Sequence, residues 1–226
     1  MAEHQYEIEI KSLLGDSEKA STLVERMKEL DPETKLSGES NQLNHYFIGG
    51  DVEKIFLNIT PHIGSEKVDS LKKVLYEGKN ISIRTRQAND TVLFVVKASI
   101  DDTTSSNGTA RIEFESEVPL SLDELDQLLL EAGCVYQAKW SRDRKEYQFK
   151  DIVVCIDRNA GYGYLAELEK IVHNGEEAEA VKKDLRDLMQ ALGIEELSQD
   201  RLLRMFAHYN EHWPEYYGTE NIFTIL

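Results

Sequence analysis

The chain has 226 residues, 41% hydrophobic and 30% charged, which suits one sizeable domain or a domain with a terminal appendage. No apolar run is long enough to span a membrane and no signal peptide is evident, so we expect a cytoplasmic protein that does not bind membranes. With 42 acidic against 26 basic residues, the net charge of −16 argues against duplex nucleic acid as the main partner, although an anionic substrate remains compatible.

The first part of the chain mixes strands and helices. Residues 5–13 are predicted to form a strand, and a helix is expected from Asp16 or Ser17 to about Leu30, because apolar residues recur there at helical spacing. Residues 42–48 are predicted to form a second strand. Beyond Gly49 and Gly50, the run KIFLNI (54–59) resembles a short strand, and a helix is expected over 66–77.

The rest of the chain is richer in strands. Strands are predicted over 81–87, 91–99, 109–118, 151–159 and 164–172, and residues 134–149 are expected to form one long bent strand or two short ones. A helix should run from Ser121 to about Ala132, because Ser121 and Glu124 have the spacing of a capping box. Amphipathic helices are predicted over 176–192 and 198–210. This order indicates an antiparallel α+β chain with a helical C-terminus.

Charged residues recur two positions apart in these strands, starting with EIEIK at 7–11. A strand places Glu7, Glu9 and Lys11 on one face and two isoleucines on the other. The same spacing recurs in Arg84 and Arg86, in Arg111, Glu113 and Glu115, in Arg142 and Arg144, and in Glu167 and Glu169. Exposure of one face to solvent explains the alternation of charged and apolar residues in any single strand. It does not explain why acidic and basic groups are sorted onto separate strands.

A closed barrel with its charged face inward and helices outside would account for the sorting. Buried charges must be paired, and a bound polyanion would compensate the basic groups. Arginine suits phosphate because its guanidinium donates two parallel hydrogen bonds. Carboxylates near phosphate require a hard divalent cation between them. The pattern therefore predicts a site for a metal-bound triphosphate.

At this point the motifs resemble a known family. EIEIK is similar to the ExExK signature of the CYTH superfamily, the triphosphate tunnel metalloenzymes, which include class IV adenylyl cyclases and thiamine triphosphatases. The segments QLNHYF, ISIRTR with VVKAS, RIEFE, RDRKEY and DRNAGYGYLAELE resemble later family strands in order, over roughly residues 5–172. The resemblance implies a closed eight-stranded antiparallel β-barrel, or tunnel, with a charged interior and helices packed outside.

The resemblance also implies an organisation and a set of roles. Residues 1–175 would form the tunnel domain, with an unusual insert at about 49–79, and residues 176–226 a helical extension packed on the barrel. Mg²⁺ or Mn²⁺ would be held by Glu7, Glu9, Glu113, Glu115, Asp157, Glu167 and Glu169. The triphosphate would be bound by Lys11, Arg84, Arg86, Lys97, Arg111, Arg142 and Arg144. Catalysis would involve Glu7, Glu9, Lys11, Arg84, Arg86 and Asp157. Which of Glu113 and Glu115 faces the metal is left open.

These roles predict an enzyme that hydrolyses a small triphosphate, such as inorganic triphosphate, thiamine triphosphate or a nucleoside triphosphate. Hydrolysis is favoured because it needs no nucleobase pocket, and none is identifiable in the sequence. A class IV adenylyl cyclase that makes cyclic AMP is the alternative, and a non-catalytic polyphosphate- or nucleotide-binding protein is a second. We expect a monomer or a homodimer.

Overall fold

The computed structural model describes residues 6–99, 111–173 and 177–225. These residues belong to two compact units. The first unit comprises the described residues up to Ser40 and from Ser141 onward, and the second comprises those from Asn41 to Trp140. In the described part of the chain, no helix is both long and apolar enough to cross a membrane.

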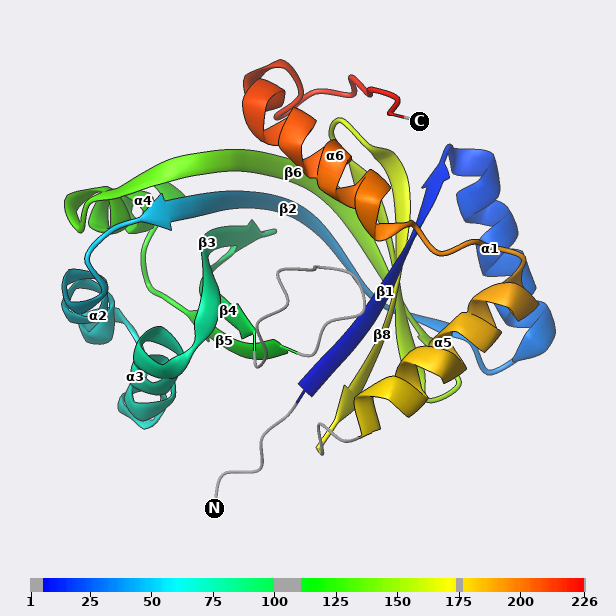
Figure 1. Cartoon of the computed structure of the whole chain (residues 1–226), viewed down its shortest axis with the longest axis horizontal. Coiled ribbons are helices and arrows are strands. Elements are labelled where there is room, and N and C mark those ends of the chain that lie inside the picture. Colours follow the sequence, from blue (N-terminus) through cyan, green and yellow to red (C-terminus); the bar gives the residue numbers. More distant parts are fainter. Residues whose placement is uncertain (1–5, 100–110, 174–176, 226) are drawn as a thin grey trace. The chain divides into compact units, whose positions relative to one another are not determined.

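The first unit is built on an antiparallel sheet in the order β6-β7-β8-β1. Its strands are β1 (Tyr6–Gly15), β6 (Cys134–Phe149, shared with the second unit), β7 (Ile152–Asn159) and β8 (Gly163–Val172). Its helices are α1 (Ser17–Leu30), α5 (Ala178–Leu192), α6 (Gln199–His212) and the 3₁₀ turn Trp213–Glu215. Helices α1 and α5 lie against β1 and β8 (Figure 1).

The alternation of apolar and charged residues along β1 explains this packing. Ile8 and Ile10 have no exposed surface and join a core that contains Met27 of α1 and Leu185 of α5. Burying each such side chain stabilises the fold by roughly 2 kcal/mol. The helices thus cover the apolar face of the sheet, and the alternating charged residues occupy the opposite face.

The second unit contains an antiparallel sheet in the order β2-β3-β4-β5. Its strands are β2 (Lys35–Gly49, which begins in the first unit), β3 (Lys79–Ala88), β4 (Thr91–Ser99) and β5 (Arg111–Glu117). Its helices are α2 (Val52–Ile59), α3 (Val68–Glu77), α4 (Leu122–Glu131) and the 3₁₀ turns Thr60–His62 and Ser65–Lys67. Phe94, Val96 and Phe114 of this sheet pack in one core with Leu71 of α3 and Leu125 of α4.

Most predicted elements are confirmed. The capping box of α4 forms as expected, with Glu124 N donating to Ser121 Oγ at 3.3 Å and Ser121 N donating to Glu124 Oε2 at 2.8 Å. Residues 134–149 form one strand rather than two. Asn89, in the turn between β3 and β4, takes the left-handed conformation (φ 53°) common in tight hairpins. Cys134 and Cys155 are free and buried.

Two local predictions were wrong. The run KIFLNI, expected to form a strand, lies in α2. Asp51 caps this helix, because its Oδ1 accepts from Glu53 N at 2.9 Å and Lys54 N at 3.1 Å. Ile55 and Ile59 lie one helical turn apart and are both fully buried, so the apolar residues of this run form one buried face of a helix. In addition, β2 begins at Lys35 rather than at residue 42.

A buried carboxylate connects α4 to the sheet of the second unit. Asp126 accepts hydrogen bonds from His45 Nδ1 at 2.6 Å, Thr85 Oγ1 at 2.5 Å and Tyr136 OH at 2.7 Å. Burial alone would raise the pKa of Asp126, but the hydrogen bonds from His45, Thr85 and Tyr136 outweigh it and lower the pKa. The carboxylate therefore stays ionised while it joins α4 to β2, β3 and β6.

The C-terminal segment is attached to the turn between β7 and β8. Gly161 N donates to Asn221 O at 2.9 Å, and Phe223 N donates to Gly161 O at 2.8 Å. The ring centroids of Tyr162 and Phe223 are 5.3 Å apart, and those of Tyr162 and Tyr209 are 5.8 Å apart. Residues after α6 thus pack on the hairpin through main-chain bonds and aromatic rings.

The α+β class and the antiparallel arrangement of the eight strands are confirmed. Closure of the eight strands into one barrel remains a prediction.

Candidate functional site

Three carboxylates converge on the charged face of the first unit. Strand register places Glu9 directly opposite Glu169. Glu7, Glu9 and Glu169 each offer a carboxylate oxygen, and these oxygens lie within 4.8 Å of one another. Burial and the neighbouring Glu167, Glu7 and Glu9 raise the pKa of Glu169 well above its usual range, although Arg144 opposes this. Crowded carboxylate oxygens are the donors that Mg²⁺ and Mn²⁺ prefer, so these three residues fit such an ion.

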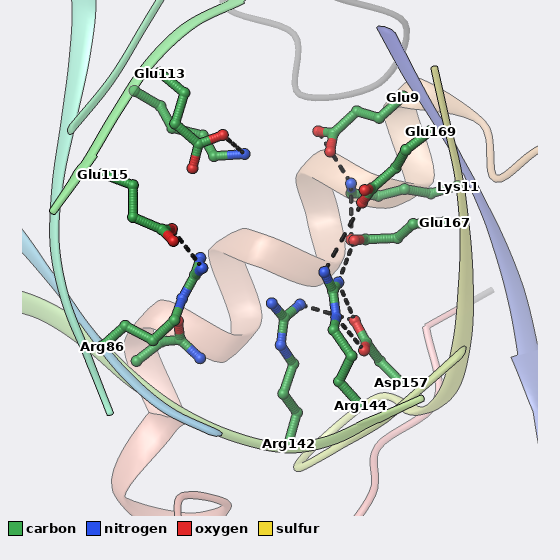
Figure 2. A network of polar contacts seen from close by, with 12 residues as sticks. Glu9, Lys11, Arg86, Glu113, Glu115, Arg142, Arg144, Asp157, Glu167 and Glu169 are labelled. Atoms are coloured by element: carbon green, nitrogen blue, oxygen red, sulfur yellow. Dashed lines mark hydrogen bonds and ion pairs between the residues drawn. The ribbon is translucent and has the colours of Figure 1, made fainter. Parts of the chain in front are cut away.

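Lys11 lies beside this acidic trio, which we define as Glu7, Glu9 and Glu169. Its Nζ is 3.1 Å from Glu9 Oε1 and 2.9 Å from Glu167 Oε1 (Figure 2). Burial would lower the pKa of Lys11, but the carboxylates of Glu167 and Glu9 outweigh it and raise the pKa. Burial would raise the pKa of Glu167, but the positive charges of Lys11 and Arg144 outweigh it and hold that pKa well below its usual range. Both groups are therefore charged at neutral pH.

Asp157 organises the two arginines of β6. It has no exposed surface, and its carboxylate accepts from Arg144 Nε and Nη2, both at 2.7 Å, and from Arg142 Nη1 at 2.8 Å. Arg144 also donates to Glu167, and its Nη1 lies 3.9 Å from Glu169 Oε1 (Figure 2). Both oxygens of Asp157 are therefore engaged by guanidinium groups, which fixes the arginines beside the acidic trio.

A second charged cluster lies on one face of the second unit. Register places Arg86 opposite Asn44, and Lys97 opposite Glu113. Arg86 donates through Nε to Asn44 Oδ1 at 2.8 Å and through Nη1 to Glu115 Oε2 at 2.9 Å. Lys97 Nζ is 2.9 Å from Glu113 Oε2. Glu113 and Glu115 therefore each form an ion pair with a basic residue of the same unit that is predicted to bind phosphate.

Arg84 is held differently from these cations. Register places it opposite Tyr46, and its guanidinium carbon lies 4.5 Å from the centre of the Tyr46 ring. Its Nε donates to Ser82 Oγ at 3.3 Å. The centroid of the Trp140 ring lies 6.3 Å from that of Tyr46. Sequence reasoning did not assign Tyr46 or Trp140 a role, because their contacts depend on cross-strand register.

The structure thus places most predicted site residues in two groups. The first unit brings together Glu7, Glu9, Lys11, Arg142, Arg144, Asp157, Glu167 and Glu169. The second unit brings together Arg84, Arg86, Lys97, Glu113 and Glu115 on one sheet face. The backbone of Arg111 lies in β5 opposite Ser99, and its side chain lies outside what the structure describes.

Comparison with known families now identifies the class. The sequence model of the CYTH domain matches residues 75–202, more than half of the chain. The chain therefore belongs to the CYTH domain family. Proteins of this family generally depend on a divalent metal, which agrees with the donor set of the acidic trio.

Solved structures show the same fold at low sequence identity. The PH1819 protein of Pyrococcus horikoshii is 19% identical with a TM-score of 0.62, and the match covers 90% of this chain and 99% of that one. The PH1012 protein of the same organism is 18% identical with a TM-score of 0.58, covering 84% and 91%. A candidate adenylate cyclase of Vibrio parahaemolyticus is 15% identical with a TM-score of 0.57, covering 89% and 99%. Among curated proteins, no sequence matches the chain significantly.

Proposed function

We propose that this chain is a divalent-metal-dependent triphosphatase that binds a small triphosphate inside a closed eight-stranded tunnel. The observation that carries the proposal is the acidic trio, whose oxygens lie within 4.8 Å of one another, next to a lysine and two ordered arginines. Membership of the CYTH domain family supports the same reading.

The described side chains divide into two roles in this proposal. Glu7, Glu9 and Glu169 would hold the metal. When bound there, Mg²⁺ or Mn²⁺ would neutralise triphosphate oxygens and make a nearby water more acidic. The triphosphate would be bound by Lys11, Arg84, Arg86, Lys97, Arg142 and Arg144.

The proposed reaction is displacement at the terminal phosphorus. A water molecule adds to that phosphorus, the bond to the bridging oxygen breaks, and the bridging oxygen keeps the bonding electron pair. Orthophosphate and a chain shortened by one phosphate leave, and the proton of the water passes to solvent. Arg142 and Arg144, already ordered by Asp157, would stabilise the negative charge on the transferred group.

Cyclisation of ATP is the competing reaction at such a site. There the ribose 3′-hydroxyl attacks the α-phosphorus and pyrophosphate leaves. Hydrolysis is preferred because it requires only the groups already present in the two clusters, whereas cyclisation also requires a surface that orients the nucleobase. Binding without turnover is the third reading, and it has no evident use for the acidic trio.

A substrate panel tests the proposal. Purified protein is incubated with tripolyphosphate, thiamine triphosphate or ATP, each with Mg²⁺ or Mn²⁺, and assayed for orthophosphate, pyrophosphate and cyclic AMP. Orthophosphate that disappears in the Glu9→Gln variant, but not in the variant Glu25→Gln on the exposed face of α1, is the expected result. Cyclic AMP with pyrophosphate would establish the cyclase instead, and no product with any substrate would leave only binding.

A further inference from the structure

Arg84 differs from the other predicted phosphate ligands in its electrostatic environment. Each of the others whose side chain the structure describes pairs with at least one carboxylate: Lys11 with Glu9 and Glu167, Arg86 with Glu115, Lys97 with Glu113, and Arg142 and Arg144 with Asp157. Arg84 makes no ion pair with any residue that the structure describes. Its positive charge is therefore not compensated by these side chains.

The contacts of Arg84 leave its hydrogen-bonding edge available. The guanidinium stacks over the Tyr46 ring at 4.5 Å, and stacking uses the face of the group rather than its N–H edge. Nε donates to Ser82 at 3.3 Å, and within the described part of the chain Nη1 and Nη2 donate to no protein group. These two nitrogens form the end of the guanidinium group, which can donate two parallel hydrogen bonds to one phosphate.

The Tyr46 ring is itself fixed in place. Its backbone is paired with Arg84 across β2 and β3, and its ring lies against Trp140, which is 8% exposed. A buried aromatic neighbour restricts the rotation of the Tyr46 side chain and so limits the positions that the guanidinium can take. Preorganisation of this kind improves affinity because less side-chain freedom is lost on binding.

We propose that Arg84 is the residue that anchors the phosphate chain and that Tyr46, backed by Trp140, is its positioning residue. An anion that reaches Arg84 breaks no ion pair with a residue that the structure describes, whereas an anion that reaches Lys11, Arg86, Lys97, Arg142 or Arg144 must displace a carboxylate. This inference rests on the proposed function, since it assumes that the charged face binds a triphosphate.

Fluorescence offers a direct readout of this arrangement. The chain has two tryptophans, Trp140 and Trp213, so Trp213→Phe leaves Trp140 as the sole reporter, 6.3 Å from the Tyr46 ring. Tripolyphosphate is titrated in EDTA, where metal-dependent turnover is absent, and the emission of Trp140 is recorded. We expect a saturable change whose midpoint gives the dissociation constant.

Substitutions at Tyr46 then separate positioning from simple packing. Tyr46→Leu removes the ring and should weaken tripolyphosphate binding roughly fivefold, whereas Tyr46→Phe keeps the ring face and should stay within about twofold of the wild type. Tyr76→Leu, on the exposed part of α3, is the matched control and should leave the affinity unchanged. In an Arg84→Lys background, Tyr46→Leu should have little further effect, because the stacked fork is already lost.

The outcomes distinguish this inference from the proposed function. Wild-type protein that does not bind tripolyphosphate would overturn both. Wild-type protein that binds it, with Tyr46→Leu folded and equally tight, would overturn only the positioning role. An additive effect of Tyr46→Leu and Arg84→Lys would also contradict it, because two independent contacts would then be lost. Circular dichroism of each variant verifies that the fold is retained.

Discussion

Asp157 shows how a single carboxylate can organise a charged face. It is fully buried and accepts three hydrogen bonds from Arg142 and Arg144. Removing its charge would take a shared, fully buried partner from both arginines, although Arg144 would keep Glu167 and Glu169 as counter-charges. Asp157 is therefore a partner of the arginines as well as a predicted ligand of the metal.

We expect Asp157→Asn to lower the free energy of unfolding by about 2 kcal/mol, because Arg142 and Arg144 lose their shared, fully buried partner while Arg144 keeps its ion pair with Glu167. Urea denaturation followed by circular dichroism measures the change. Asp184→Asn, at an exposed position of α5, is the control and should alter stability little. Equal stability of Asp157→Asn and the wild type would show that Arg142 and Arg144 find other partners.

Glu169 should respond in two opposite ways to substitution. Burial and the adjacent acidic groups disfavour its charged form, so Glu169→Gln should raise the stability of the metal-free protein by an amount on the order of 1 kcal/mol. The same change removes a proposed metal ligand and should weaken Mn²⁺ binding by roughly 100-fold or more. Thermal unfolding in EDTA and titration calorimetry with Mn²⁺ measure the two effects. A variant that is destabilised and binds Mn²⁺ normally would contradict the assignment.

At the scale of elements, Asp126 explains how α4 is held on the sheet of the second unit. Its three hydrogen-bond donors come from β2, β3 and β6. His45 and Thr85 are direct cross-strand partners, and the neighbouring pairs are Tyr46 with Arg84 and Asn44 with Arg86. The anchoring of α4 and the placement of the two arginines therefore depend on the same strand pair.

This junction should make stability depend on pH in a defined window. The pKa of Asp126 is lower in the folded state than its ordinary value of about 3.9, so the folded state favours the ionised carboxylate. The stabilisation is complete above that ordinary value and is lost as the pH falls towards the lower, folded value. Unfolding free energy measured against pH should therefore fall less steeply in this window for Asp126→Asn than for the wild type. Parallel curves for the two proteins would exclude Asp126 as a contributor.

At the scale of the molecule, the C-terminal segment connects the end of the chain to the β7–β8 turn of the first unit. Gly161 has φ +81°, and a Cβ added there would lie 2.7 Å from Tyr209 Cε2 and 3.0 Å from Phe223 Cε1. Only glycine combines this backbone conformation with such close ring contacts. The turn is therefore matched to the aromatic residues that pack on it.

Gly161→Ala should destabilise the protein by roughly 2 kcal/mol or more, since it adds a steric clash to an unfavourable φ. Gly193→Ala is a matched control, because Gly193 has φ +73° with nothing within 4 Å of the added Cβ. It should cost only about 1 kcal/mol, from the backbone conformation. Thermal unfolding and limited proteolysis near Phe223 measure the difference. Equal effects of the two substitutions would mean that the aromatic packing adapts without cost.

Local sequence patterns predicted most helices and strands and the charged faces of the strands, whereas contacts between residues on different strands could not be predicted. Alternation along β1 and β8 predicted that Glu9, Lys11 and Glu167 lie on the charged face of the sheet, where they do contact one another, because alternate residues of a strand share a face. The hydrogen bond of His45 to Asp126 joins residues 81 positions apart, and nothing local indicates it. Tyr46 was missed for the same reason, since its role depends on strand pairing. The run KIFLNI in α2 was predicted to be a strand because so short an apolar segment fits both the helical and the strand periodicity.

The paired cations have a consequence for what this protein can recognise. A bare triphosphate must break several ion pairs and leave carboxylates facing its own oxygens, whereas a triphosphate that arrives with its metal offers each carboxylate a new counter-ion. The true substrate should then be the one-to-one chelate. Turnover should peak where metal and triphosphate are equimolar, and uncomplexed triphosphate should bind measurably, through Arg84, but more weakly than the chelate.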